Sequence, residues 1–192
     1  MEKFKGKYRI PSARLQTWNY GWNGAYFITI CTKNRINYFG RIINRKMELS
    51  HIGIVADILW YEIKNHADRL ELGAFVVMPN HIHGILILNN NDNQRSRDKA
   101  CLVSTPLTID RTDNDRTIGQ QRFQNQGKNT ISSIIGGYKS AVTKHTHRLG
   151  YEFAWQPRFH DYIIRNDVAY DRIVEYIQNN PRNWHQDKFY DL

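Results

Sequence analysis

Several features are scarce in this chain of 192 residues, and each scarcity excludes a class of protein. Only two cysteines are present, Cys31 and Cys101, too few for a disulfide framework or a cysteine-based zinc site. The sequence has no run of 18 or more apolar residues, so no membrane-spanning helix is predicted. The first residues are basic without an apolar stretch behind them, unlike a signal peptide. We therefore expect a cytoplasmic protein with no membrane partner.

Acidic residues are scarce relative to basic ones. The chain has 27 Lys plus Arg against 18 Asp plus Glu, which gives a formal net charge of +9 and a pI near 9.6. This charge favours a polyanionic partner, and nucleic acid is the first candidate. Five Trp and eleven Tyr supply rings on which bases can stack. The alternative is a basic protein with an ordinary aromatic core, because charge bears on association and not on fold.

The hydrophobic pattern of the first half predicts a strand, a helix and two further strands. Residues 26–32 are β-branched or aromatic, which is typical of a buried central strand. Ser50 precedes apolar residues spaced by three and four, which predicts a capped amphipathic helix ending near Asn65. Residues 73–78 and 81–88 are predicted to be two strands joined by a turn.

From residue 89 to about 129 the composition shifts toward Asn, Asp, Gln, Arg and Ser. Such a segment lacks the apolar surface that would offset the entropy of ordering it. We therefore predict a mobile insertion at 89–129 within a single domain that spans residues 1–192.

The second half is predicted to contain a helix, a strand and a final helix. Thr130 is a plausible cap for a helix that stops near Gly150, and residues 159–165 form a strand. The final helix begins at Asn166 or Asp167 and ends before a proline. This order indicates an α+β fold, an antiparallel sheet with helices packed mainly on one face.

His81 and His83 lie two residues apart in a predicted strand, so both imidazoles project from one face and can share one ion. Ile85 and Ile87 continue the strand as an apolar element, and an unpaired polar group in a buried strand is costly. A ligand role would account for that cost. The alternative is a pair of half-exposed histidines in an edge strand.

Tyr176 and Asn180 stand four residues apart and share one face of the final helix. Tyrosine attacks phosphodiesters when a metal polarises the phosphate and the phenol proton is removed. The alternative is that Tyr176 is a core residue, because it has helical spacing with Ile173 and Ile177. Tyr170 lies on a different face of the helix and is the second candidate nucleophile.

Four segments resemble the single-tyrosine transposases. In residues 76–85 the pair His81-Ile82-His83 resembles the HUH signature, two histidines around a hydrophobic residue. The other three segments resemble the basic helix of the REP-associated branch, its following segment and its catalytic helix: residues 134–144, residues 155–159 with 163–165, and residues 176–181. Together they cover most of residues 25–184 in the expected order. Tyr162 occupies a position where the related branch often has histidine, so no role is transferred to it.

The resemblance to the IS200-like and REP-associated (Y1, HUH) transposases implies a ferredoxin-like core that cleaves and rejoins single-stranded or hairpin DNA through a 5′-phosphotyrosine intermediate. It implies that Tyr176 is the nucleophile and that His81 and His83 hold Mg²⁺ or Mn²⁺. Asn180 is the expected third ligand, where insertion-sequence relatives have glutamine. Within this family the protein either mobilises its own element or processes dispersed repeats, as a monomer or a homodimer.

Five basic residues are candidate DNA contacts, Lys139, Lys144, Arg148, Arg158 and Arg165, although an ordinary charged surface is equally compatible with their spacing. Two other functions stay open. A hairpin-binding protein on the same fold would lack cleavage. A ferredoxin-like RNA-binding domain would need aromatic rings exposed on its sheet, for which Tyr26 and Phe27 are the candidates.

Overall fold

The computed structural model describes residues 22–67, 69–89 and 129–190. The predicted insertion at 89–129 lies outside the described residues except for its first and last positions. Within the described part no helix is both long and apolar enough to cross a membrane.

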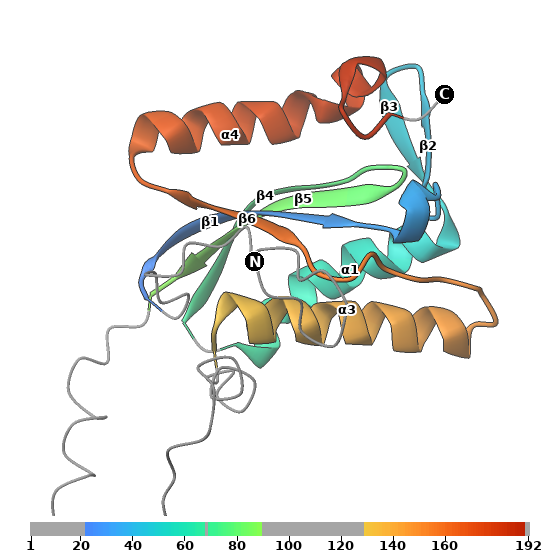
Figure 1. Cartoon of the computed structure of the whole chain (residues 1–192), viewed down its shortest axis with the longest axis horizontal. Helices are drawn as coiled ribbons and strands as arrows, with labels where there is room; N and C mark the ends of the chain where they lie inside the picture. The colour runs from blue at the N-terminus through green and yellow to red at the C-terminus, as the bar shows by residue number, and fades with distance from the viewer. Residues whose placement is uncertain (1–21, 68, 90–128, 191–192) are drawn as a thin grey trace, which may run out of the picture.

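One antiparallel sheet of four strands organises the described residues (Figure 1). Its order is β4-β5-β1-β6, so β5 and β1 are inner strands and β6 lies at an edge. The strands are β1 (Gly24–Cys31), β4 (Leu70–Val77), β5 (His81–Leu88) and β6 (His160–Ile164). With α1 (His51–His66) and α3 (Ile131–Arg148) they form the β-α-β-β-α-β arrangement of ferredoxin-like folds, as the family resemblance implied.

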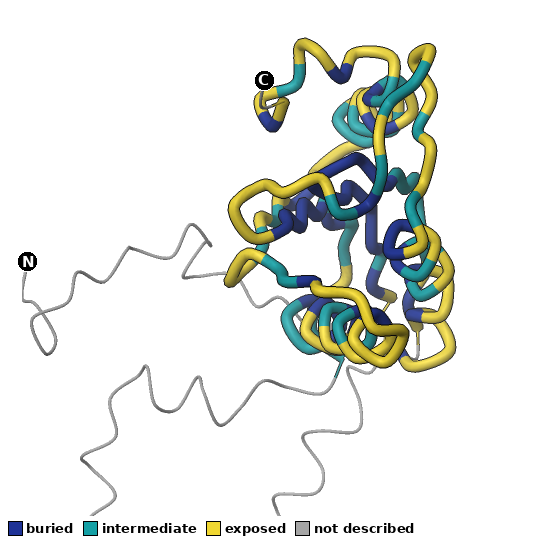
Figure 2. Tube along the Cα trace, turned by 90° about the vertical axis from the view of Figure 1, so that its right-hand side faces the viewer, coloured by how far each residue is buried: buried dark blue, intermediate teal, exposed yellow. Residues whose placement is uncertain are grey.

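The helices divide between the two faces of the sheet. Figure 1 shows α1 and α3 side by side below the sheet and α4 (Asp167–Asn179) above it. Tyr26, Ile28 and Ile30 of β1 face the main core with α1 and α3, whereas Phe27 faces α4. Figure 2 shows the buried residues concentrated where these layers meet. The expectation of helices mainly on one face therefore describes α1 and α3, while the last helix covers the opposite face.

Each predicted cap is present. The Ser50 hydroxyl accepts the Gly53 N–H, Thr130 and Ser133 form a reciprocal capping box, and Asn166 accepts the Ala169 N–H. These side chains satisfy N–H groups that have no partner within the first turn of a helix. The helix starts are therefore determined locally.

Two features at the carboxyl end of β1 were not predicted. A hairpin of β2 (Gly40–Ile43) and β3 (Lys46–Leu49) precedes α1, and its tight turn has positive φ at Asn44 and Arg45. After α4 the chain continues as the 3₁₀ turn η2 (Asn180–Gln186), because Pro181 is tolerated in the first turn of a helix. The final α-helix itself ends before Pro181, as expected.

Candidate metal and nucleophile site

The alternation of β5 places His81 and His83 on the face of the sheet that α4 covers. Ile85, on the same face, packs against Ile177 of that helix. His81 is 0% exposed and His83 is 1% exposed, and β5 lies inside the sheet. The alternative of half-exposed histidines in an edge strand is therefore wrong.

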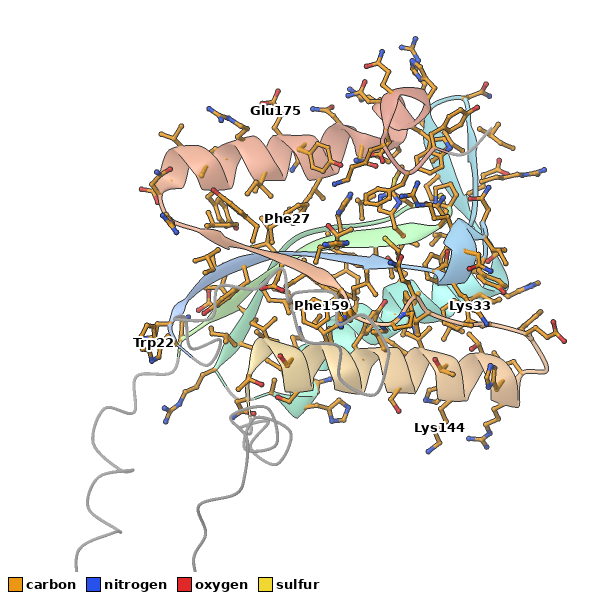
Figure 3. The ribbon with its side chains drawn as sticks, viewed as in Figure 1. Trp22, Phe27, Lys33, Lys144, Phe159 and Glu175 are labelled. Carbon is orange, nitrogen blue, oxygen red and sulfur yellow. The ribbon has the colours of Figure 1, made fainter. Side chains whose placement is uncertain are left out.

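His83 links the sheet to the last helix. Its Nδ1 shares a hydrogen bond with the Thr29 hydroxyl at 2.9 Å, and its Nε2 lies 3.2 Å from the hydroxyl of Tyr176. The ring also stacks on Phe27 with a centroid distance of 5.1 Å. Figure 3 shows Phe27 in the layer between the sheet and α4. The candidate nucleophile and the histidine pair therefore meet within one chain.

His81 has a ring nitrogen that the fold leaves unused. Its Nδ1 donates to the Asn80 side-chain oxygen at 2.9 Å, since an amide oxygen only accepts. That bond leaves the Nε2 lone pair of the neutral ring available, and this atom is buried without a hydrogen-bond partner among the described residues. Metal-binding histidines commonly donate their second N–H in this way. The donor chemistry of His81 therefore fits a metal ligand.

Asp187 joins the site although no sequence motif indicated it. One carboxylate oxygen accepts hydrogen bonds from the Tyr176 hydroxyl and from the Asn180 amide, both at 3.1 Å. Ligand atoms of His81, His83 and Asp187 lie within 4.8 Å of one another. The Asn180 side-chain oxygen is also buried without a partner among the described residues. Two imidazoles and a carboxylate suit Mn²⁺ and similar divalent ions.

Burial controls the charge states of the site. It lowers the pKa of His81 to about 3, helped by the positive charges of Lys188 and Arg35. Burial also lowers the pKa of His83 well below its usual value, and the His81 charge acts in the same direction. Both rings are therefore neutral near pH 7, as metal ligation requires.

The phenol of Tyr176 is held protonated in this structure. Burial, followed by the negative charge of Asp187, raises its pKa to about 12. Tyr176 nevertheless remains 41% exposed, so this candidate nucleophile forms the open side of the site. A cation held by Asp187 would offset the negative charge of that carboxylate. It would therefore lower the pKa of the Tyr176 phenol.

No protein-family model matches the chain. An uncharacterized protein of Haemophilus influenzae is 37% identical over 186 residues, which cover 96% of this chain and 95% of that protein. The two chains belong to one family. The solved structure of a REP-associated tyrosine transposase bound to a REP hairpin superposes with a TM-score of 0.55. The match has 22% sequence identity and covers 91% of this chain and 77% of the other. The chain has the fold of a REP-associated tyrosine transposase.

On this transposase fold the candidate nucleophiles have different surroundings. Tyr176 contacts His83, whereas the Tyr170 side chain packs beside Gly73 of β4 in the apolar layer beneath α4. Six residues separate the two tyrosines along the helix axis, a rise of about 9 Å. The helix therefore presents Tyr176, and not Tyr170, to the histidines.

The predicted DNA contacts are not gathered at this site. Lys144 and Arg148 are exposed on α3, and Figure 3 shows Lys144 pointing away from the sheet on the side opposite α4. Lys139 is half-buried, and its ammonium group donates to the backbone carbonyls of Gln156 and Arg158. Through these two hydrogen bonds Lys139 connects α3 to the segment before β6.

Arg158 and Arg165 flank β6 and are both exposed. Arg158 precedes the strand and has a φ of 75°, an uncommon backbone conformation for a residue other than glycine. Arg165 follows the strand directly. These two arginines therefore lie at the ends of the sheet edge.

Proposed function

We propose that this protein cleaves and rejoins single-stranded DNA through a covalent phosphotyrosine intermediate. The observation that carries the proposal is the contact between the Tyr176 hydroxyl and His83, at 3.2 Å, beside the unpaired nitrogen of His81. A tyrosine that only packs in the core has no requirement for two buried neutral histidines beside its hydroxyl. Hairpin DNA is the proposed substrate, because the superposed REP-associated transposase was solved with a REP hairpin.

The proposed reaction is a transesterification that conserves the phosphodiester bond energy. The Tyr176 oxygen attacks phosphorus, the bond from phosphorus to the 3′ oxygen breaks, and a 5′-phosphotyrosine and a free 3′-hydroxyl result. The phenol proton leaves and the departing 3′ oxygen gains a proton, so the step is balanced. Attack by a 3′-hydroxyl on the phosphotyrosine reverses it and rejoins the strand.

His81, His83 and Asp187 are the proposed holders of a divalent ion, Mg²⁺ or Mn²⁺, with the Asn180 oxygen as a further donor. When bound, such an ion supplies Lewis-acid stabilisation of the negative charge that develops on the phosphate. Thr29 and Asn80 orient the two rings through their Nδ1 atoms. Asp187 also holds the Tyr176 hydroxyl and the Asn180 amide in place.

We further propose that the site is complete within one subunit. Tyr176 on α4 reaches His83 of its own chain, and η2 returns Asp187 to the same point. A monomer can therefore carry out the reaction, and a homodimer is not required for its chemistry.

The decisive experiment is a covalent-adduct assay. End-labelled single-stranded DNA containing a hairpin from the flank of the gene is incubated with protein and Mg²⁺, Mn²⁺ or EDTA, then run on a denaturing gel. We expect a metal-dependent adduct that Tyr176→Phe abolishes, because the phenylalanine variant lacks only the nucleophilic oxygen. His83→Ala is expected to lower the adduct yield about a hundredfold, since the loss of a residue that only orients a ligand already costs about 10–100-fold.

Tyr170→Phe is the matched control, because it removes the other hydroxyl of the same helix and should leave the adduct unchanged. An adduct that survives Tyr176→Phe but not Tyr170→Phe would reassign the nucleophile. Tight hairpin binding without any adduct would instead favour a non-catalytic hairpin-binding protein.

A further inference from the structure

The last helix covers the carboxyl end of β6 but leaves the middle of that edge strand exposed. Its apolar side packs against residues of all four strands: Ala74 of β4, Ile85 of β5, Phe27 of β1 and Ile164 of β6. The edge strand β6 lies beyond β1, and Tyr162 of that strand is 56% exposed. A large aromatic side chain therefore stands on an open strip of the sheet beside α4.

The strand register places Tyr162 on the same face as the histidine pair. Tyr162 is opposite Phe27 in the pairing of β1 with β6, and His160 is opposite Thr29. Directly opposite residues of neighbouring strands project to the same side and their Cβ atoms lie about 5 Å apart. Tyr162 is thus adjacent to Phe27, which is partly buried beside the site.

Phe27 connects Tyr162 to the proposed chemistry. Its ring stacks on His83 with a centroid distance of 5.1 Å and meets the edge of the Tyr176 ring at 6.1 Å. Tyr162 is therefore one strand away from a ring that contacts both a proposed ligand and the proposed nucleophile. A nucleotide next to a phosphate at Tyr176 would reach this strip.

The polar residues of β6 itself, with the arginine that follows it, suit an anionic strand. His160 projects on the same face, and the exposed Arg165 follows the strand. Asp161 is the one acidic residue of β6, and it pairs with Ile28 on the opposite face of the sheet. Phosphates that flank a base at Tyr162 would therefore meet no carboxylate from the exposed side of this strand.

We infer that Tyr162 is a stacking platform for an unpaired base of the DNA strand that enters the site. Aromatic rings exposed on a sheet bind bases through their faces, independently of base identity. This inference rests on the proposed function for the position of the strand, but it concerns binding and not cleavage. It assigns the sheet-surface ring to Tyr162, because Tyr26 is fully buried and Phe27 is partly buried under α4.

The test uses a short oligothymidine strand that carries 2-aminopurine at successive positions, measured in EDTA so that no cleavage occurs. Stacking quenches 2-aminopurine fluorescence, and we expect quenching at a restricted set of positions. Tyr162→Ala should restore the fluorescence there and weaken binding about tenfold, the effect of removing one stacked base. Tyr162→Phe keeps the ring and should retain both quenching and affinity.

Tyr61→Ala is the matched control, because Tyr61 is 54% exposed on α1, which covers the opposite face of the sheet. Its loss should leave both readouts unchanged.

Wild-type quenching and affinity in Tyr162→Ala would overturn the inference, even if Tyr176 forms the covalent adduct. A change confined to self-association, measured by analytical ultracentrifugation, would also overturn it by making β6 an interface between copies. Quenching that depends on Tyr162 without an adduct in any variant would sustain the inference while the proposed cleavage fails.

Discussion

At the scale of single residues, His81 and His83 are polar side chains that are nevertheless completely buried. Both rings are inaccessible to solvent, and each uses Nδ1 for a neighbouring oxygen. Burial destabilises the charged form of each ring, because an imidazolium loses its hydration in the interior. The pair therefore stays neutral in the folded protein over a wide pH range.

This burial makes stability depend on pH. The pKa of His81 is about 3 in the folded protein against 6.5 for an unperturbed histidine, so the unfolded chain binds more protons between these values. Stability should therefore fall as pH drops from about 6.5 toward 3, by at most about 1.4 kcal/mol per pH unit from this group. Urea unfolding of His81→Gln in EDTA should show a shallower dependence between pH 7 and pH 5 than the wild type.

The control for this prediction is His145→Gln, an exposed histidine of α3 that should leave the pH dependence unchanged. His83→Gln offers a second test, because burial lowers the pKa of His83 in the same direction. Parallel pH profiles for all four proteins would contradict the assignment of the buried pair.

At the scale of elements, β5 serves different functions on its two faces. One face carries the histidines toward α4, and the other has Gly84 beneath the ring of Trp60 from α1. A Cβ at Gly84 would lie 2.2 Å from a carbon of that ring. The glycine is thus required for a buried tryptophan to approach the strand closely, directly next to His83.

We predict that Gly84→Ala destabilises the protein by about 1–3 kcal/mol, the usual cost of overpacking a core. Chemical denaturation at pH 7 measures it. Gly136→Ala on α3 is the matched control, because a Cβ there meets no atom within 4 Å. That substitution should stabilise the helix by up to about 1 kcal/mol. Equal stabilities for the two variants would contradict the close approach of Trp60.

At the scale of the whole molecule, the proposed chemistry and the basic surface of α3 lie on opposite sides of the sheet (Figure 1). Lys144 and Arg148 are exposed on that helix, whereas Tyr176 and His83 lie beneath α4. Arg158 and Arg165 flank the β6 edge between these two sides. A DNA molecule that passed around this edge would meet four of the predicted contacts along one path, whereas the Lys139 ammonium group donates to backbone carbonyls.

We predict that Lys144→Gln combined with Arg148→Gln weakens hairpin binding and flattens its salt dependence. The slope of log K against log salt should fall by about 0.9 for each lost phosphate contact to a duplex stem. Lys64→Gln, an exposed cation on α1, is the control and should change neither quantity. Fluorescence anisotropy at several salt concentrations measures both. An unchanged slope in the double variant would identify α3 as an ordinary charged surface.

Much of the molecule follows from the sequence because the relevant signals are local. Hydrophobic periodicity and capping residues predicted β1, α1, β5, α3 and α4 near their observed bounds, and alternation placed His81 and His83 on one face. Helical spacing likewise put Tyr176 and Asn180 on one side of α4. The hairpin of β2 and β3 was missed because its strands are short and carry several charges.

Only the tertiary structure decided which of these surfaces meet. Alternation separates the two faces of a strand, but it does not say which helix covers each face. The approach of α4 to β5 brought Tyr176 to His83, and the turn after it brought in Asp187 from outside every motif. The same approach left Tyr162 exposed, while α1 and α3 buried Tyr26 on the other face of the sheet. Local chemistry thus determined the candidates, and long-range packing determined their neighbours and their solvent exposure.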